Sequence, residues 1–203
     1  MIKAVLFDFG GVLTESGRSG FVAHILAELY GVDPRRLDVN ADHYMLRRGQ
    51  GDEDALFAKL NTRFAKQVTK QMFLEKAHDL FVPSHEVYDL AARLRKHGLK
   101  TGILSNIFAM NAAILRQQGR YEGFDPVILS CDEGHAKPDK ELYEVAVQRL
   151  GLAPKEILFV DDQEKCTKPA EAIGMSALLA VSPKQIVADV TAIIERQNGI
   201  ALQ

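Results

Sequence analysis

Four groups of polar residues in this chain have side chains that could act together at one reactive site. They are Asp8, Ser105–Asn106, Lys137 and Asp161–Asp162. An aspartate can attack an electrophile, a lysine can neutralise developing negative charge, and adjacent carboxylates can hold a divalent cation. Each group alone is compatible with an ordinary turn, helix cap or solvated corner. Because all four lie at or near the ends of successive apolar runs, we interpret them as parts of one site.

The elements that must position these groups alternate along the chain. Short, nearly continuous apolar runs predict strands that are buried on both faces, and helical patterns follow most of them. The runs cover residues 2–9, 100–105, 124–130, 156–161 and 175–181, and the helical patterns cover 84–98, 109–119, 139–151, 168–174 and 183–197. This alternation predicts an α/β fold with a doubly wound parallel sheet. Ligands of such sheets bind at the carboxyl ends of the strands.

The alternation stops between residues 15 and 82, where no strand-like run occurs. Four segments with helix-spaced apolar residues follow one another there, at 19–31, 34–49, 52–66 and 70–81. The sequence therefore predicts a core domain made of residues 1–14 and 83–203. A helical-bundle domain, residues 15–82, is inserted after the first strand.

Composition narrows the range of partners. The 203 residues are 47% hydrophobic and 26% charged, with a formal net charge of -2, which is ordinary for a water-soluble protein. Nothing in this charge favours nucleic acid or an anionic membrane, and no apolar run is long enough to span a bilayer. The N-terminal run lacks the features of a signal peptide, so we expect a cytoplasmic protein. Cys131 and Cys166 are expected to be buried free thiols. The oligomeric state is left open.

Four short strings in this order resemble the motifs of the haloacid dehalogenase-like hydrolase superfamily. They are FDFGGVLT (7–14), ILSN (103–106), KPD (137–139) and FVDDQEKCTKPAEAIGM (159–175). The resemblance covers nearly the whole chain, since residues 15–82 correspond to the family's helical cap. It implies a Rossmann-like core and, for most members, a magnesium-dependent phosphatase. The first motif is most similar to a sugar-phosphate phosphatase-like branch, which suggests a small phosphorylated substrate.

The resemblance also implies a metal site. In the family pattern, Mg²⁺ would be bound by the Asp8 carboxylate, the backbone carbonyl of Gly10 and Asp162, with Asp161 nearby. Glycine at position 10 does not damage this site, because only its carbonyl oxygen is needed. Oxygen ligands are those that Mg²⁺ prefers.

The remaining motif residues would handle the phosphoryl group. By resemblance, Asp8 would form an aspartyl-phosphate that water later hydrolyses. The Ser105 hydroxyl and the Asn106 backbone N–H would bind phosphoryl oxygens, and Lys137 would neutralise charge. Such a reaction depends mainly on positioning and electrostatic stabilisation.

Three positions depart from the family pattern. Gly10 replaces the aspartate that protonates the leaving group, Cys166 stands where many relatives have asparagine, and Ala136 stands where relatives often have arginine. The loss at Gly10 matters least for leaving groups that depart unprotonated, such as anomeric or aryl oxygens. Alternatively, Glu15 could reach back and act as the acid.

Substrate selection is expected from the inserted helices, because lids over a rigid scaffold often choose the substrate. Arg47 and Arg48 could present a guanidinium to a phosphate or hydroxyl, although they could equally be solvated at a helix end. Gly11 and His135 are further candidates for contact with the substrate.

Two other classes of function stay open at this point. A 2-haloacid dehalogenase needs no acid at Gly10, but it has no use for the acid pair Asp161–Asp162. A non-catalytic phospho-ligand-binding regulatory protein would tolerate Gly10 and Cys166, but it would not need Asp8, Lys137 and Asp162 together.

Overall fold

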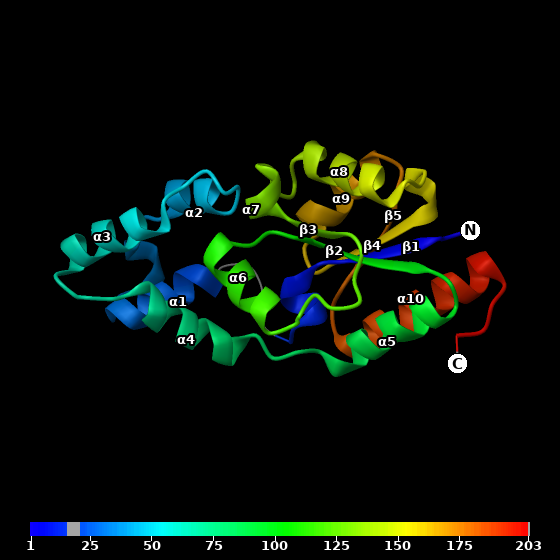
Figure 1. The fold of residues 1–203 in the computed structure, drawn as a ribbon, viewed down its shortest axis with the longest axis horizontal. Coiled ribbons are helices and arrows are strands. Elements are labelled where there is room, and N and C mark those ends of the chain that lie inside the picture. The colour runs from blue at the N-terminus through cyan, green and yellow to red at the C-terminus, as the bar shows by residue number, and fades with distance from the viewer. Residues whose placement is uncertain (16–20, 203) are drawn as a thin grey trace.

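The computed structural model describes residues 1–15 and 21–202, and it confirms the α/β class (Figure 1). Within these residues the sheet contains five parallel strands in the order β3-β2-β1-β4-β5. The strands are β1 (Ala4–Phe7), β2 (Lys100–Ser105), β3 (Val127–Leu129), β4 (Ile157–Asp161) and β5 (Ser176–Leu179). After β1 the chain adds β2 and β3 on one side, and it then crosses over to add β4 and β5 on the other side. This is the doubly wound arrangement that the sequence predicts.

The central strand β1 is buried on both faces. Val5 and Phe7 belong to one apolar cluster of the core, while Ala4 and Leu6 belong to another on the opposite face. This is the two-residue alternation of a strand. Phe7 is in register with Ile103 of β2 and Val160 of β4, so the chain segments that follow these strands emerge side by side.

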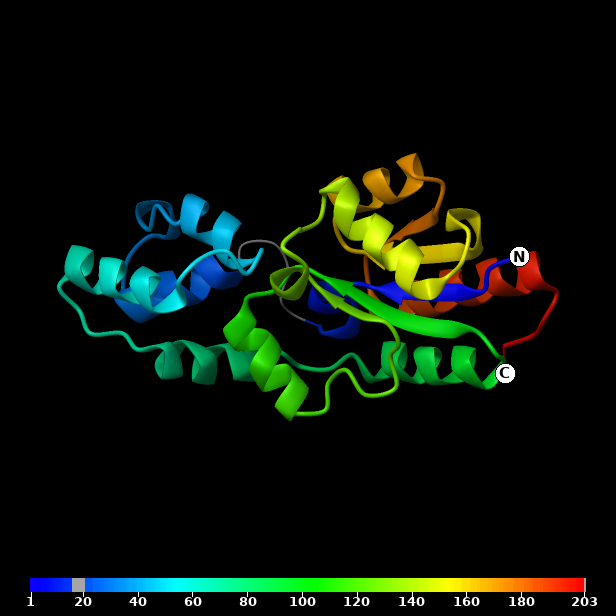
Figure 2. The same ribbon diagram turned by 45° about the horizontal axis from the view of Figure 1, so that its top comes forward.

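Helices cover both faces of the sheet (Figure 2). The pair α5 (His85–Lys96) and α10 (Pro183–Asn198) packs on the face of Val5 and Phe7. The pair α8 (Lys140–Leu150) and α9 (Glu164–Ala172) packs on the other face. The remaining helices of this part are α6 (Ala109–Gln117) and the short α7 (Ser130–Glu133).

Two predicted boundaries are wrong in a way that affects the site. The strand predicted at 124–130 is confined to β3, because α7 begins at Ser130. The helix predicted at 168–174 begins at Glu164, since the Gln163 carbonyl already accepts hydrogen bonds from the N–H groups of Cys166 and Thr167. This earlier first turn places Gln163 and Lys165 close after the acid pair that ends β4.

The inserted helices form a layer with its own apolar interior. These helices are α1 (Phe21–Tyr30), α2 (Asn40–Leu46), α3 (Glu53–Phe64) and α4 (Lys70–Leu80). The predicted start of the first one, at residues 19–20, lies outside the described residues. The segment predicted as one helix at 34–49 is divided, because a 3₁₀ turn at Pro34–Arg36 ends near Asp38, whose φ of 50° is left-handed.

The two chain crossings between the helical layer and the sheet pair with each other. The Glu15 N–H donates to the Val82 carbonyl at 2.9 Å, and Thr14 and Pro83 form an isolated antiparallel bridge. Helix α6 contributes apolar side chains to the interiors of both layers. The division of the chain into two domains at residues 14–15 and 82–83 stays a prediction, and this paired crossing lies at the predicted boundary.

Candidate active site

Asp8 follows β1 directly and begins a tight turn. It is buried, its N–H donates to the Val160 carbonyl at 2.8 Å, and its Oδ1 accepts the Phe9 N–H at 2.7 Å. The turn that follows is a single π-helical turn, η1 (Phe9–Leu13), in which Gly10 has a φ of -73° and Gly11 has a φ of 75°. Gly11 thus occupies the left-handed region that favours glycine, whereas the φ of Gly10 is open to any L-residue.

Lys137 joins two buried carboxylates. Its side chain is 2% exposed, and its Nζ lies 2.9 Å from Asp8 Oδ1 and 2.6 Å from Asp161 Oδ2. Burial works against the ammonium, but Asp161 and Asp8 outweigh it and raise the pKa of Lys137. Burial raises the pKa of Asp8 to about 7, against the opposing effect of Lys137. Lys137 is therefore a fixed positive charge beside the candidate nucleophile.

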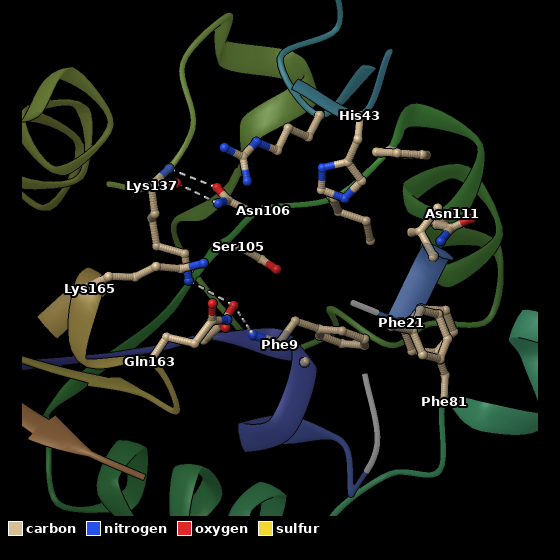
Figure 3. A pocket seen from close by; sticks show the side chains of 16 residues that line it. Phe9, Phe21, His43, Phe81, Ser105, Asn106, Asn111, Lys137, Gln163 and Lys165 are labelled. Atoms are coloured by element: carbon tan, nitrogen blue, oxygen red, sulfur yellow. Dashed lines mark hydrogen bonds and ion pairs between the residues drawn. The ribbon is translucent and has the colours of Figure 1, made fainter. Parts of the chain in front are cut away.

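The Asn106 side chain holds the backbone of Lys137 in place (Figure 3). Its Nδ2 donates to the Lys137 carbonyl at 2.7 Å, and its Oδ1 accepts the Lys137 N–H at 2.8 Å. Ser105, the last residue of β2, is 2% exposed and points into the same cavity. The structure thus brings together Asp8, Ser105, Asn106 and Lys137, which the sequence places far apart.

The acidic residues of the site fit a magnesium ion. Ligand oxygens of Asp8, Asp161 and Asp162 lie within 4.8 Å of one another. Asp161 is fully buried, and its two oxygens already bind Lys137 Nζ and, at 2.8 Å, the Gln163 N–H. Three carboxylates around one ammonium leave an excess of negative charge in a mostly buried place, and a divalent cation would offset it. Both oxygens of Asp161 are thus engaged within the protein, and the assignment of Asp8 and Asp162 as metal ligands stays a prediction.

A cavity of about 130 Å³ opens above Asp8, Ser105 and Lys137. Figure 3 shows side chains of the sheet on one side of it and those of the inserted helices on the other. Much of the wall away from Asp8 is aromatic. The rings of Phe9 and Phe81 are 6.0 Å apart and those of Phe21 and Phe81 are 5.0 Å apart.

Helix α2 contributes two basic side chains to this cavity, His43 and Arg47. The sequence analysis selected Arg47 but missed His43, although His43 lies one helical turn earlier and hence on the same face. The His43 ring lies 5.2 Å from that of Phe108. Burial, together with the charges of Arg47 and Lys165, lowers the pKa of His43 to about 4.

Three further polar residues of the wall were missed. Gln163 and Lys165 follow Asp162 at once, so an earlier predicted start of α9 would have revealed them. Asn111, on α6, carried no signal in the sequence. It is 4% exposed, and its Oδ1 is buried without a hydrogen-bond partner.

The structure does not bring Gly11 or Glu15 to this cavity. Both line a second cavity, with Ser84 and Lys184, whose lining includes neither Asp8 nor Lys137. Glu15 is exposed, and its backbone is paired with Val82. The hypothesis that Glu15 replaces the missing acid therefore stays a prediction that this arrangement does not support. Gly11 allows the left-handed turn after Asp8, and its contact with a substrate stays a prediction.

Arg48 and His135 are also placed outside the cavity. Arg48 is 5% exposed, its Nε donates to Asp139 Oδ2 at 3.1 Å, and its guanidinium lies 3.7 Å from the ring centre of Tyr44. It therefore connects the helical layer to the loop after Lys137. His135 lines a shallow pocket beside Arg48 and Asp139. Neither residue lines the cavity above Asp8, and their contact with a substrate stays a prediction.

The other departures from the family pattern are accommodated by packing. Ala136 is fully buried, and its N–H donates to Asp139 Oδ2 at 3.2 Å. Cys166 is a buried free thiol, as predicted, and its carbonyl accepts the Tyr143 hydroxyl at 2.8 Å. Cys131 is also a free thiol, but it is half-buried instead of buried.

Comparison with known proteins assigns this combination of fold and site to a family. A model described as haloacid dehalogenase-like hydrolase matches residues 2–174, so the chain belongs to the haloacid dehalogenase-like hydrolase family and is a hydrolase. It is 30% identical to the pyrophosphatase PpaX of Bacillus cereus, over 79% of this chain and 74% of that protein. It is 28% identical to mouse acyl-CoA dehydrogenase family member 10, where 95% of this chain spans only 19% of the longer protein.

Solved structures support the fold. A predicted HAD-like hydrolase from Porphyromonas gingivalis superposes with a TM-score of 0.81 at 21% identity, covering 97% of this chain and 100% of that one. A HAD family enzyme from Bacteroides thetaiotaomicron, solved with magnesium and inorganic phosphate, has a TM-score of 0.72 at 21% identity, covering 90% and 96%. In the described part of this chain, no helix combines the length and apolar character needed to cross a membrane.

Proposed function

We propose that this hydrolase is a magnesium-dependent phosphatase that acts on a small phosphorylated metabolite through an aspartyl-phosphate on Asp8. The observation that carries the proposal is the group formed by Asp8, Lys137 and Asp161 at the floor of a cavity, with Asp162 close by. Relatives named as phosphatases and a fold neighbour solved with magnesium and phosphate support it.

In the first step, an oxygen of the Asp8 carboxylate attacks phosphorus, and the bond from phosphorus to the leaving oxygen breaks. The Phe9 N–H and Lys137 Nζ both bind Asp8 Oδ1 and so fix the orientation of the carboxylate. Ser105 and the Asn106 backbone N–H are proposed to bind the phosphoryl oxygens. Donors that are already in position cost no reorganisation when charge develops. When bound, Mg²⁺ would supply Lewis-acid stabilisation of phosphoryl charge, with Asp8, Asp162 and the Gly10 carbonyl as ligands.

In the second step, water attacks phosphorus, inorganic phosphate departs, and the Asp8 carboxylate is regenerated. Gly10 provides no side chain to protonate the leaving oxygen or to activate this water. The site is therefore best suited to leaving groups that depart as anions. A sugar phosphate esterified at its anomeric oxygen meets this requirement, and it remains the substrate that the resemblance predicts.

The two other functions fit the site less well. A dehalogenase without a metal gains nothing from three converging carboxylates, which repel one another. A protein that only binds a phosphorylated ligand needs no buried carboxylate beside the phosphoryl group, since that carboxylate opposes the binding of an anion.

The test is release of inorganic phosphate from a panel of sugar phosphates, nucleotides and acyl phosphates, with Mg²⁺ or with excess chelator. Chloride release from 2-chloropropionate is measured in parallel. We expect turnover of at least one phosphate, lost on chelation and restored by Mg²⁺, and no chloride release. Chloride release without a metal would instead establish the dehalogenase, and phosphate binding without turnover of any compound would favour the regulatory protein.

A further inference from the structure

We propose that the cavity contains a second anion subsite, formed by Arg47 and Lys165, so that the substrate carries a carboxylate or phosphate in addition to the phosphoryl group at Asp8. This inference rests on the proposed function, because it assigns the substrate class of the same cavity. Arg47 belongs to the inserted helices, which no family motif covers, and Lys165 lies in α9, within the fourth motif.

The first observation is the state of the Arg47 guanidinium. Arg47 lines the cavity from α2, and its Nε is buried without a hydrogen-bond partner. Leaving a buried donor of a charged group unsatisfied is costly, so such a group is normally paired. The nearby Asp139 carboxylate is not the partner of Arg47 Nε, because it already binds Arg48 and the Ala136 N–H. A ligand anion is the partner that this geometry lacks.

The second observation is the balance of charge around the cavity. Lys137 is neutralised by Asp8 and Asp161, but Arg47 and Lys165 make no ion pair with any carboxylate among the side chains that the structure describes. The wall is therefore left with two positive charges that the protein does not compensate. Because protein partly surrounds the cavity, their field is screened less than at an open surface and attracts an anion.

The behaviour of the neighbouring groups agrees with this excess of positive charge. Arg47 and Lys165 both act to lower the pKa of His43, after burial as the main cause. Burial and the charge of Arg48 lower the pKa of Arg47 itself. The groups that face His43 are thus cations from α2 and α9 and the ring of Phe108, and His43 stays neutral beside them. A neutral imidazole adds a hydrogen-bonding group without cancelling the subsite's charge.

The two ends of the cavity separate the two anions. Ser105 and Lys137 lie at one end of the cavity, and His43 of the inserted helices lies at the other (Figure 3). Arg47, which ends α2, lines the cavity from these helices, and Lys165 lines it from α9. With a volume of about 130 Å³, the cavity suits a small molecule with an anion at each end. A guanidinium binds carboxylate and phosphate through paired N–H donors, so either group satisfies it.

The experiment uses phosphonates, which bind at a phosphoryl site but cannot be hydrolysed. Phosphonoacetate is compared with ethylphosphonate, and 3-phosphonopropionate with propylphosphonate, by calorimetric titration of the Mg²⁺-loaded protein. Each pair differs mainly in a terminal carboxylate. We expect the wild type to bind at least one carboxylated ligand about tenfold more tightly than its alkyl partner, the size of one charge-assisted contact.

The variants assign the preference to residues. Arg47→Met keeps a long side chain without the charge and is expected to reduce the preference to less than about threefold, while alkylphosphonate affinity stays within about twofold of wild type. Lys165→Met is expected to have a smaller effect in the same direction, because Lys165 is exposed. Arg36→Met is the matched control, since Arg36 is an exposed arginine of the same helical layer, and it is expected to change neither affinity. Thermal unfolding checks that each variant is folded.

The outcomes are separable. Equal binding within both pairs by the wild type would overturn the subsite. So would an Arg47→Met protein that binds carboxylated and alkyl ligands equally less well, since Arg47 would then hold the phosphoryl group itself. A carboxylate preference that depends on Arg47, in a protein that releases phosphate from no ester, would support the subsite and overturn the proposed phosphatase activity. If none of the four phosphonates bound, both proposals would fail.

Discussion

The two sides of the cavity differ in how many of their polar side chains already have partners within the protein. On the side of the sheet, Lys137 contacts two carboxylates, and Asn106 makes two hydrogen bonds to the Lys137 backbone. On the side of the helices, the Arg47 Nε and the Asn111 Oδ1 are buried without a partner. The polar groups named on the sheet side are paired before any ligand binds, whereas those on the helix side can still form hydrogen bonds to a ligand.

From this difference we assign catalysis to the sheet side of the cavity and substrate recognition to the helix side. A network whose members are all satisfied is rigid, and rigid donors and acceptors stabilise a transition state well. Unsatisfied buried groups are a cost to the folded protein that a ligand can relieve on binding. We therefore expect changes on the sheet side to affect turnover of every substrate alike, and changes on the helix side to affect the choice among substrates.

The largest effect is expected from Asp8→Asn, which removes the candidate nucleophile and leaves its size unchanged. Turnover should fall by about a thousandfold or more, as is usual when a nucleophile is lost. The amide can still accept the Phe9 N–H, so the fold should survive. The measurement is Mg²⁺-dependent phosphate release, together with thermal unfolding. A variant that unfolds normally and retains a rate within about tenfold of wild type would refute the role of Asp8.

Asn106→Ala is expected to be the next largest change, because it removes the side chain that holds Lys137. Small displacements of a catalytic charge can cost about a hundredfold in rate, so we expect kcat to fall by about ten- to a hundredfold. The loss should be similar for every substrate tested. Asn106→Asp is the matched variant, since it keeps the acceptor for the Lys137 N–H but not the donor to its carbonyl. A large difference in the loss between substrates would show that Asn106 takes part in recognition instead.

His43 provides a test of the helix side through stability. The pKa of His43 is lowered to about 4 in the folded protein, whereas its ordinary value is 6.5. As the pH falls below 6.5, the unfolded chain therefore binds this proton more readily than the folded protein does. The contribution of neutral His43 to the free energy of unfolding is thus fully present above about pH 6.5 and is lost as the pH falls towards 4. Between about pH 7 and about pH 5, this one group should cost on the order of 2 kcal/mol.

The measurement is urea unfolding at the two pH values for wild type and His43→Gln. Glutamine has a similar size and does not titrate, so the variant should lose less stability on acidification by about that amount. His24, an exposed histidine of the inserted helix α1, supplies the control substitution. Equal pH dependence of wild type and His43→Gln would mean that His43 is not held neutral in the cavity.

The same division explains how much could be predicted from the sequence. The sheet and the residues at its strand ends were predictable, because buried parallel strands are short apolar runs and their carboxyl ends must meet. Asp8, Ser105 and Asp161 follow from that rule, whereas Lys137 lies beyond α7 and was found through the order of the motifs. The boundary of α9 was misplaced, since the pattern at 168–174 predicts a later start than Glu164, and the helix contains Pro169.

The helix side was less predictable, because its geometry depends on how two layers pack. Consecutive helical residues project about 100° apart, so of Arg47 and Arg48 only one could face the cavity, and the sequence does not say which. The structure directs Arg47 inward and commits Arg48 to Asp139. Likewise, nearness in sequence made Glu15 a candidate acid, but its pairing with Val82 places it in another cavity.

Gly10 lies where the sheet side and the helix side of the cavity meet. Of these predictions, its substitution should change the rate least and should be the most informative. Without an acid at this position, the barrier should rise with the pKa of the leaving group, so that aryl phosphates react well and simple alkyl phosphates poorly. Gly10→Asp restores a carboxyl group at a φ of -73°, which an L-residue adopts without strain. We expect about a tenfold gain for alkyl phosphates, close to 1.4 kcal/mol in the barrier, and little change for aryl phosphates.

Gly11→Ala is the contrast, because a φ of 75° disfavours a Cβ and should lower stability by about 1 kcal/mol without this selectivity. If the wild type shows no dependence on leaving-group pKa, the proton must come from another group. His43 and Lys165 would then be the donors to test, and part of the chemistry would belong to the side of the cavity that we assign to recognition.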